Sequence, residues 1–340
     1  MMRGHAADPP RPPRRTWLQQ AVALAAAGAA AGHAAGARAA PAWPGGPVRI
    51  LLVYPPGGVS DQVLRSLAEQ LAPLLGVPVQ VDYRPGAGGS LGLTALAAAP
   101  PDGHTLAFSA LSPLTLYPQL AKVRYDPLRD ITPVAGVMLT PSLLVGTPAF
   151  EGASVADLTR AARAAPGRLR WATTGAGTTG HLVLAQWQRA TGCSVTHIPY
   201  KGGGQQLNDA LAGHFELLST NVAAAQRQHI RSGQFKPLAV GAPQRLDSLP
   251  DVPTWAELGL PDANLASVFG LMAPAGTPAV VVQRLNQLVN QLLDGPVLKE
   301  QLRAADNLPA GGSAARFAAL VRQEFQQHQA LLQRAPISLD

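Results

Sequence analysis

The chain has 340 residues, of which 47% are hydrophobic and 14% charged, and its formal net charge is +7. This length suits two domains with cores of their own, and so apolar a composition excludes an intrinsically disordered chain. The 34 glycines and 32 prolines follow no three-residue period, which excludes a collagen-like protein. Cys193 is the single cysteine, so an intramolecular disulfide, a cysteine-based zinc site and an iron–sulfur cluster are excluded as well.

The first 39 residues carry the features of an export signal in the usual order. Arg14-Arg15 precede Thr16, Trp17 and Leu18, as in twin-arginine signals, and an alanine-rich apolar run follows over residues 21–31. Residues 37–39 read Ala-Arg-Ala and fit an A-x-A cleavage site, and the apolar run is too short to span a bilayer. We therefore expect residues 1–39 to be removed on export, by the twin-arginine or the general secretory route, and the mature protein to be periplasmic.

Removal of this segment lowers the net charge on which a nucleic-acid-binding interpretation would depend. The whole chain has 27 Lys and Arg against 20 Asp and Glu, and residues 1–39 hold five of the arginines and one of the aspartates. The rest of the chain therefore has a net charge of only +3, with no basic stripe and few aromatic side chains for base stacking. We expect no nucleic-acid partner.

Beyond the signal, short apolar strands alternate with amphipathic helices, which is typical of α/β proteins. We expect strands over residues 48–53, 78–81, 105–108, 169–174, 195–198 and 269–273. The pairs Ser154–Asp157 and Thr254–Glu257 have the spacing of capping boxes and predict helix starts. Further helix starts are expected at Ser60 or Asp61, Ser90, His181, Gly204, Pro278 and Ser313.

Residues 175–180 match the G-x-G-x-x-G pattern between a predicted strand and a predicted helix. A dinucleotide site also needs an acidic residue about 20 positions later, and residues 195–200 contain none. The sequence has no Gly-Lys-Ser/Thr for a phosphate-binding P-loop, and the histidines after residue 39 show no metal-ligand spacing. We expect neither a cofactor nor a metal, and we interpret His197, in an apolar strand, as a core residue.

Ser90 raises the alternative of an exported α/β hydrolase. It lies in Gly88-Gly89-Ser90-Leu91-Gly92, which matches the G-x-S-x-G nucleophile elbow. An elbow places its serine directly after a strand, whereas residues 84–87 intervene here, and Asp102 and His104 share one short turn. We favour a helix-capping role for Ser90 and keep the hydrolase as the alternative.

Glycine-rich loops occur at four predicted strand-to-helix junctions, after Tyr54, Arg84, Thr174 and Tyr200. A helix N-terminus offers unpaired N–H groups and the positive end of the helix dipole, and glycine lets a ligand approach the backbone closely. Two such loops from each half of the chain would clamp an anion between them. The alternative interpretation is that the loops are only tight turns.

Eight motifs in order resemble the solute receptors of the tripartite tricarboxylate transporter family, the Bug-type periplasmic binding proteins. They lie at residues 43–44, 54–61, 84–89, 101–106, 125–130, 199–202, 249–259 and 273–278. The resemblance covers about Trp43 to Leu332. It implies a solute-binding protein that captures a small carboxylate for uptake or sensing, and not an enzyme. It also implies the membrane subunits of such a transporter as partners, and a monomer.

The resemblance further implies a type II periplasmic-binding-protein fold, in which two α/β lobes joined by two crossovers enclose a ligand cleft. Lobe one would comprise residues 43–141 and 264–340, and lobe two residues 142–263. Family members hold a ligand carboxylate largely through backbone groups and water. By this analogy the ligand-binding residues from lobe one are Pro56, Gly57, Gly58, Asp61, Gly86, Ala87, Gly88, Gly89 and Ser109. From lobe two they are Thr178, Thr179, Tyr200 and Gly202.

The chain departs from the family pattern at three places. Residues 217–221 contain no acid where many members carry an Asp, Phe269 replaces a common Trp, and residues 203–206 replace a Pro-Ala type of helix start. We expect Thr220 or Asn221 to offer neutral hydrogen bonds, and the ligand to be a carboxylate without an amine. Glu216 would contradict this expectation if its side chain reached the cleft.

Overall fold

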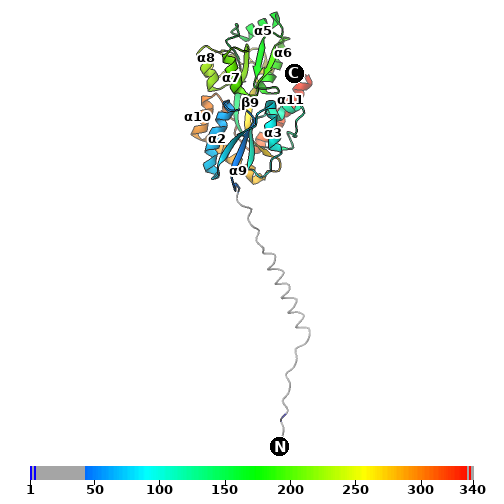
Figure 1. The fold of residues 1–340 in the computed structure, drawn as a ribbon, viewed down its shortest axis with the longest axis vertical. Coiled ribbons are helices and arrows are strands. Elements are labelled where there is room, and N and C mark those ends of the chain that lie inside the picture. The colour runs from blue at the N-terminus through cyan, green and yellow to red at the C-terminus, as the bar shows by residue number, and fades with distance from the viewer. Residues whose placement is uncertain (2–3, 5–42, 335–336, 338–340) are drawn as a thin grey trace. The chain divides into compact units, whose positions relative to one another are not determined.

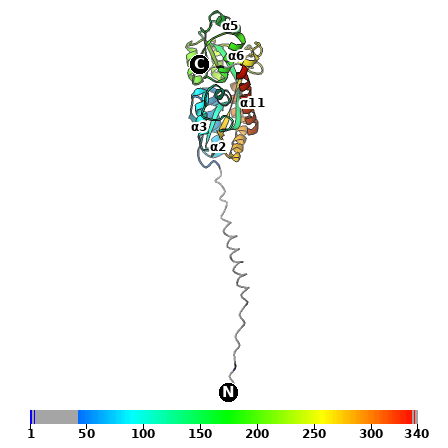
Figure 2. The same cartoon turned by 90° about the vertical axis from the view of Figure 1, so that its right-hand side faces the viewer.

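The computed structural model describes residues 43–334, together with residues 1, 4 and 337. The expected export signal, residues 1–39, lies outside the described residues except for residues 1 and 4. The chain from Trp43 onward forms one compact unit. In two perpendicular views, helices α5 and α6 lie at one end of this unit and α2 and α3 at the other (Figures 1 and 2).

The first group of strands begins with three parallel strands in the order β2 (Val79–Tyr83), β1 (Val48–Leu52) and β3 (Thr105–Ala110). The order continues from β3 to the antiparallel β9 (Ala266–Pro274) and then β4 (Ile131–Gly146), with β10 (Leu308–Pro309) beside β4. The helices of this part are α2 (Val59–Leu75), α3 (Ser90–Ala97), α4 (Ser112–Thr115), α9 (Ala279–Asp294), α10 (Pro296–Ala304) and α11 (Ala314–Arg334). Short 3₁₀ turns, η1 (Ala87–Gly89) and η2 (Tyr117–Gln119), complete it.

The second group of strands is built on the far half of β4. There β4 pairs with β7 (Leu217–Asn221) and β8 (Lys236–Gly241), and β5 (Arg170–Thr173) and β6 (Thr196–Pro199) follow beyond β7. The helices of this part are α5 (Val155–Ala164), α6 (Thr179–Thr191), α7 (Gly203–Leu211) and α8 (Ala224–Arg231), with the turn η3 (Pro261–Ala263).

Strand β4 changes partners part-way along its length. Its residues 131–141 pair with β9, and its residues 142–146 pair with β7 and β8. The chain enters the second group of strands along β4 and returns from β8 to β9, so two segments cross between the groups. Two α/β lobes joined by two crossovers are the type II periplasmic-binding-protein fold that the family resemblance implies.

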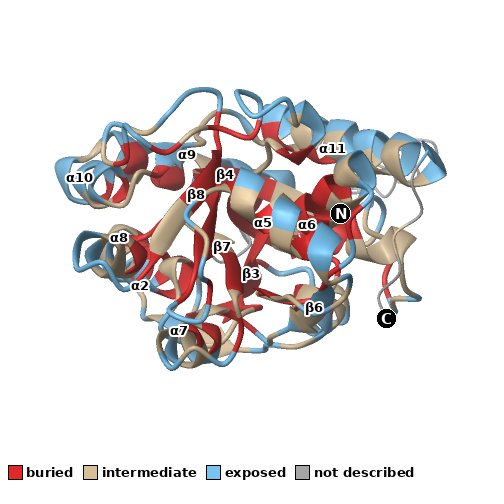
Figure 3. Ribbon diagram, turned by 90° about the horizontal axis from the view of Figure 1, so that it is seen from above, coloured by how far each residue is buried: buried red, intermediate tan, exposed pale blue. Residues whose placement is uncertain are grey.

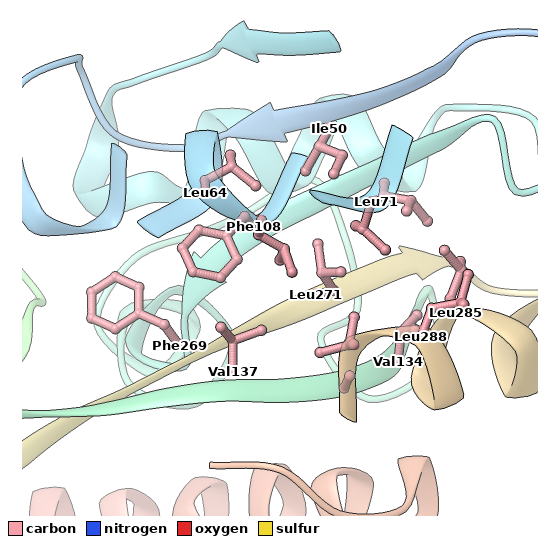
Figure 4. Packing of buried hydrophobic residues seen from close by; sticks show 14 of the residues in the cluster. Ile50, Leu64, Leu71, Phe108, Val134, Val137, Phe269, Leu271, Leu285 and Leu288 are labelled. Carbon is pink, nitrogen blue, oxygen red and sulfur yellow. The ribbon is translucent and has the colours of Figure 1, made fainter. Parts of the chain in front are cut away.

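Each lobe has its own apolar core. In the first, Leu64 and Leu71 of α2 and Leu285 of α9 pack against Ile50 and Phe108 of the sheet (Figure 4). In the second, the buried side chains of Trp171, Trp187 and Trp255 form the centre. Figure 3 shows the buried strands in the interior, with exposed residues mostly on the outer helices and loops. Leu64 and Leu71 of α2 and Leu285 and Leu288 of α9 recur at helical spacing, and all four are buried, as expected of amphipathic helices.

The predicted helix starts are partly right. Ser154 and Asp157 form the expected capping box, with Asp157 N–H donating to Ser154 Oγ at 3.1 Å. Thr254 and Glu257 also bond reciprocally, but a turn follows and no helix, so that prediction is wrong. Gly58 and Gly89 are the N-cap residues of α2 and α3, which corrects the expected capping by Ser60, Asp61 or Ser90.

The sequence analysis missed β4, whose 16 residues include Pro133, Gly136 and Pro141. Proline and glycine argue against a strand interior, since proline cannot donate to the ladder. The structure accommodates two of them at irregularities, because the register against β9 shifts between Pro133 and Ala135 and between Gly136 and Met138.

Candidate functional site

A cleft between the lobes is the candidate site. It encloses about 930 Å³ of unfilled space, part of it open to solvent. From the first lobe it is lined by Tyr54, Pro55, Gly57, Gly58, Val59, Ser60, Gln62, Ala110, Ser112, Ser267 and Phe269. Ser142 of β4 and residues of the second lobe complete it: Thr174, Thr178, Thr179, Gly180, Gly202, Gly203, Leu207, Ser219, Thr220, Asn221, Ala223, Ala225 and Gln226.

Four helices begin at this cleft. The N-cap residues of α2, α6, α7 and α8 are Gly58, Thr178, Gly202 and Ala223, and all four line the cleft. None of these four residues makes a side-chain capping hydrogen bond. The N-termini of four helices therefore lie at one cleft, and the positive ends of their dipoles favour an anion there.

The side chains of the cleft are neutral. None of the described residues that line it is an Asp, Glu, Lys, Arg or His; the polar ones are hydroxyls and amides. The lining therefore offers an anion only helix N-termini, hydroxyls and amides, and it offers no carboxylate as partner for an ammonium group.

One wall of the cleft is aromatic. Tyr54 follows β1 and contacts Phe269 edge-to-face, with ring centroids 6.1 Å apart, and Phe269 stacks on Phe108. Burial raises the pKa of Tyr54 to about 12, although hydrogen bonds with Ser109 and Ser112 act in the opposite direction. Tyr54 therefore stays a neutral phenol over the physiological range.

Asp61 lies behind the first glycine loop. Its carboxylate accepts hydrogen bonds from Gly57 N–H at 2.8 Å, Tyr83 O–H at 2.8 Å and Arg65 Nε at 3.0 Å. Burial by itself would raise the pKa of Asp61, but the hydrogen bonds from Gly57, Tyr83 and Arg65 hold it below its ordinary value. Asp61 is buried and does not line the cleft, so it acts on the site by fixing the loop that carries Gly57 and Gly58.

The second predicted loop, Gly86–Gly89, makes a contact between the lobes. A Cβ added at Gly88 would lie 2.7 Å from the carbonyl oxygen of Ala176, in the loop that precedes α6. On another part of the cleft rim, a Cβ at Gly202 would lie 2.4 Å from Cδ of Pro55. The two lobes thus contact each other at both places, through the backbone of Ala176 at Gly88 and through the ring of Pro55 at Gly202.

Two histidines support the loop before α6. His181 Nδ1 accepts a hydrogen bond from Gly177 N–H at 3.1 Å, and His181 stacks on His197 with ring centroids 4.2 Å apart. His197 Nε2 lies 2.7 Å from Thr173 Oγ1. Burial lowers the pKa of both histidines to about 4, so both are neutral at pH 7. His197 has a hydrogen-bond partner, but it is half-buried on the edge strand β6, which corrects the interpretation of it as a core residue.

The predicted site residues fall into two sets. Those that line the cleft are Gly57, Gly58, Thr178, Thr179, Gly202, Thr220 and Asn221. Those that the structure places beside or behind it are Pro56, Asp61, Gly86, Ala87, Gly88, Gly89, Ser109 and Tyr200. Tyr200, for example, donates its O–H to Asp209 at 2.7 Å.

Sequence reasoning missed several polar lining residues, among them Ser142, Ser219, Gln226 and Ser267. Ser142 and Ser267 lie on the crossover strands β4 and β9, and no motif surrounds them. Only the position of the crossovers between the lobes could have indicated that these two serines line the cleft.

Glu216 does not reach the cleft. It accepts hydrogen bonds from Arg170 N–H at 2.7 Å and from the guanidinium at 2.6 Å. Burial would raise the pKa of Glu216, but Arg170 holds it below its ordinary value. The Glu216 carboxylate is therefore paired with Arg170 and does not offer a partner for an amine of the ligand.

The geometry around Ser90 does not assemble a hydrolase triad. Ser90 begins α3, past the carboxyl end of β2, and is 5% exposed. Asp102 and His104 immediately precede β3, which runs parallel to β2 through β1, so they lie at the opposite edge of the sheet. His104 Nδ1 is 3.1 Å from the carbonyl oxygen of Pro47.

Two absences hold for the part of the chain that the structure describes. No helix there combines the length and apolar character needed to cross a membrane. No three His, Cys, Asp or Glu side chains there gather closely enough to hold a metal ion.

Comparison with known proteins identifies the family. The sequence model of the tripartite tricarboxylate transporter family receptor, TctC, matches residues 63–337. This chain belongs to that family. Protein BugT of Bordetella pertussis is 34% identical over 287 residues, which cover 84% of this chain and 88% of BugT.

Solved structures of the same fold include ligand complexes. The Rpa4515 protein of R. palustris with adipate has a TM-score of 0.82 and 32% identity, covering 87% of this chain and 99% of that one. MatC of Rhodopseudomonas palustris with bound malate has a TM-score of 0.81 and 28% identity, covering 85% and 100%. The periplasmic binding protein BugD has a TM-score of 0.82 and 29% identity, covering 87% and 99%.

Proposed function

We propose that this TctC-family protein is an exported receptor that captures a small carboxylate in the interlobe cleft. The observation that carries the proposal is the convergence of four helix N-termini without side-chain caps on a cleft whose described lining has no charged side chain. Such a cleft binds an anion through backbone N–H groups and hydroxyls. The adipate and malate in the related structures are anions of this class.

The ligand that the cleft suits is a carboxylate without an amine. An ammonium group enclosed between the lobes would need an anionic partner, because an unpaired buried charge costs several kcal/mol. The lining supplies none, and Thr220 and Asn221 offer neutral groups. The aromatic wall of Tyr54 and Phe269 suits an apolar middle section of the ligand.

The family and the N-terminal sequence support a proposal for the role in the cell. We propose that residues 1–39 direct export and are removed, and that the mature monomer works in the periplasm with the membrane subunits of a tripartite tricarboxylate transporter. Lobe one would comprise residues 43–141 and 264–340, and lobe two residues 142–263. The partner exchange of β4 at residues 141 and 142 supports these limits.

We propose no catalytic role. The hydrolase alternative depends on Ser90, which lies apart from Asp102 and His104. A fluorophosphonate label distinguishes the two functions, because covalent modification of Ser90 would support the hydrolase.

The decisive experiment is a calorimetric titration of the mature protein with succinate, adipate, malate and benzoate, followed by aspartate as the aminated partner of succinate. We expect at least one amine-free carboxylate to bind, and to stabilise the protein by about 2.7 kcal/mol at 100 times its Kd. Failure of all four to bind would contradict carboxylate capture. Binding of aspartate more than about tenfold tighter than succinate, about 1.4 kcal/mol, would contradict the amine-free ligand.

A further inference from the structure

Three polar side chains from different elements are joined by hydrogen bonds on the cleft lining and form a hydrogen-bond chain. Asn221 ends β7, Ser267 lies near the start of β9, and Thr179 is the first residue of α6. Asn221 Nδ2 donates to Ser267 Oγ at 3.1 Å, and Ser267 Oγ donates to Thr179 Oγ1 at 3.0 Å. All three residues line the cleft.

The direction of this chain is set at Asn221. Its Nδ2 also lies 3.3 Å from the carbonyl oxygen of Thr140, which can only accept. The amide nitrogen, and not the amide oxygen, must therefore occupy this position, and both of its hydrogens are used. Ser267 then accepts from Asn221.

The direction passes from Ser267 to Thr179. Ser267 is only 6% exposed, and leaving a buried hydroxyl hydrogen unpaired costs free energy. Thr179 Oγ1 is its partner. Because Thr179 already accepts this hydrogen bond, its own hydroxyl hydrogen is free to point into the cleft as a donor.

We propose that Asn221 is a specificity-determining residue, which polarises the Asn221–Ser267–Thr179 chain so that the Thr179 hydroxyl donates to an oxygen of the bound carboxylate. This inference rests on the proposed function. It identifies the Thr179 hydroxyl as the group of the cleft that donates to an ionised carboxylate oxygen of the ligand. A carboxylate in place of the Asn221 amide would lack both amide hydrogens and would face the carbonyl oxygen of Thr140. The chain would then run in the opposite direction, and Thr179 would be left as an acceptor.

The first test needs no ligand. We compare the melting temperatures of the wild type, Asn221→Asp and the matched control Asn208→Asp, whose asparagine is exposed on α7, at pH 7.5 and pH 4.5. At pH 7.5 the ionised carboxylate introduced by Asn221→Asp is repelled by the Thr140 oxygen, so this variant should melt well below the wild type. At pH 4.5 a protonated carboxyl can donate, so the difference should shrink, while Asn208→Asp should show no such pH-dependent difference. An equal difference for Asn221→Asp at both pH values would overturn the assigned polarity.

The second test is a double-mutant cycle with adipate and succinate as probes. Thr179→Val removes the donor and should weaken binding about tenfold, while Thr179→Ser keeps the hydroxyl and should restore most of the affinity. Ser267→Ala should weaken binding in the wild type but have no effect in Thr179→Val, because its contribution passes through Thr179.

The outcomes separate the two claims. Full additivity of Thr179→Val and Ser267→Ala, or tight binding by Thr179→Val, would overturn the inference and leave carboxylate capture intact. If the wild type bound none of the carboxylates, this result would instead refute the proposed function and, with it, the role of Thr179 in ligand binding. The pH comparison of Asn221→Asp would then still decide whether Asn221 polarises the chain.

Discussion

Asp61 shows how a single buried carboxylate shapes the cleft without lining it. It fixes Gly57 N–H, Tyr83 O–H and Arg65 behind the first glycine loop. We predict that Asp61→Asn lowers the free energy of unfolding by about 1–3 kcal/mol, because a neutral amide has one acceptor oxygen in place of two and loses the charge-assisted hydrogen bonds. Urea denaturation at pH 7 measures this loss.

The same variant has a defined pH dependence. The folded-state pKa of Asp61 is lowered from 3.8, so its stabilisation is present above pH 3.8 and is lost as the pH falls through the lower, folded value. The difference between wild type and Asp61→Asn should therefore shrink below about pH 3.8. The control is Arg65→Gln, whose side chain is 57% exposed, so this variant should destabilise the protein less than Asp61→Asn. An equal cost for both variants would contradict the anchoring role of Asp61.

Glu216 is a residue whose role could not be read from the sequence. Its ion pair with Arg170 holds it away from the cleft. We predict that Glu216→Gln lowers the free energy of unfolding by about 1 kcal/mol and leaves carboxylate affinity within about twofold. Calorimetry and chemical denaturation of the same variant give both values, and a gain in affinity for succinate would show that Glu216 acts on the ligand.

At the scale of elements, α6 and β6 meet through the stacked rings of His181 and His197. Burial lowers both pKa values from 6.5 to about 4, so the unfolded chain binds protons more readily than the folded protein. Stability should therefore be complete above about pH 6.5, decline as the pH falls from 6.5 to 4, and change little from these residues below 4. Melting temperatures across this range measure the effect.

His181→Asn tests the origin of that decline, because an asparagine Oδ1 can accept from Gly177 N–H and does not titrate. The variant should show a flatter profile between pH 6.5 and 4 than the wild type. An unchanged slope would assign the acid sensitivity to other groups.

Elements also differ in how far sequence alone predicts them. The α5 capping box joins Ser154 to Asp157 across three residues, so its chemistry is readable in one window. Strand β4 is not readable in this way, because its partners β9, β7 and β8 come much later in the chain. Pro133 and Gly136 are tolerated because they lie at register shifts that exist only once β9 is in place.

Across the molecule as a whole, the lobes touch through glycines. Pro55 of one lobe lies against Gly202 of the other, where an added Cβ would be 2.4 Å from the proline ring. Lobes joined by two crossovers open and close about a hinge. We predict that Gly202→Ala keeps the cleft partly open, so that its radius of gyration with saturating adipate exceeds that of the wild type, and that adipate binds about tenfold more weakly.

The adjacent Gly203→Ala is the matched control for this prediction. A Cβ at Gly203 meets nothing within 4 Å, so this variant should contract with adipate as the wild type does. Small-angle scattering with and without adipate makes the comparison. Full contraction of Gly202→Ala would show that the contact with Pro55 does not limit closure.

Features that depend on neighbouring residues could be predicted from the sequence: most of the order of strands and helices, the amphipathic character of the helices, and the glycine loops before them. The ordered motifs also led to the correct family. Tertiary contacts were needed to learn which loop residues line the cleft, where Glu216 points and how Asn221, Ser267 and Thr179 connect. The physical reason is separation along the chain, because those hydrogen bonds join residues 46 and 88 positions apart. No local pattern encodes such a contact until the lobes and their crossovers bring its members together.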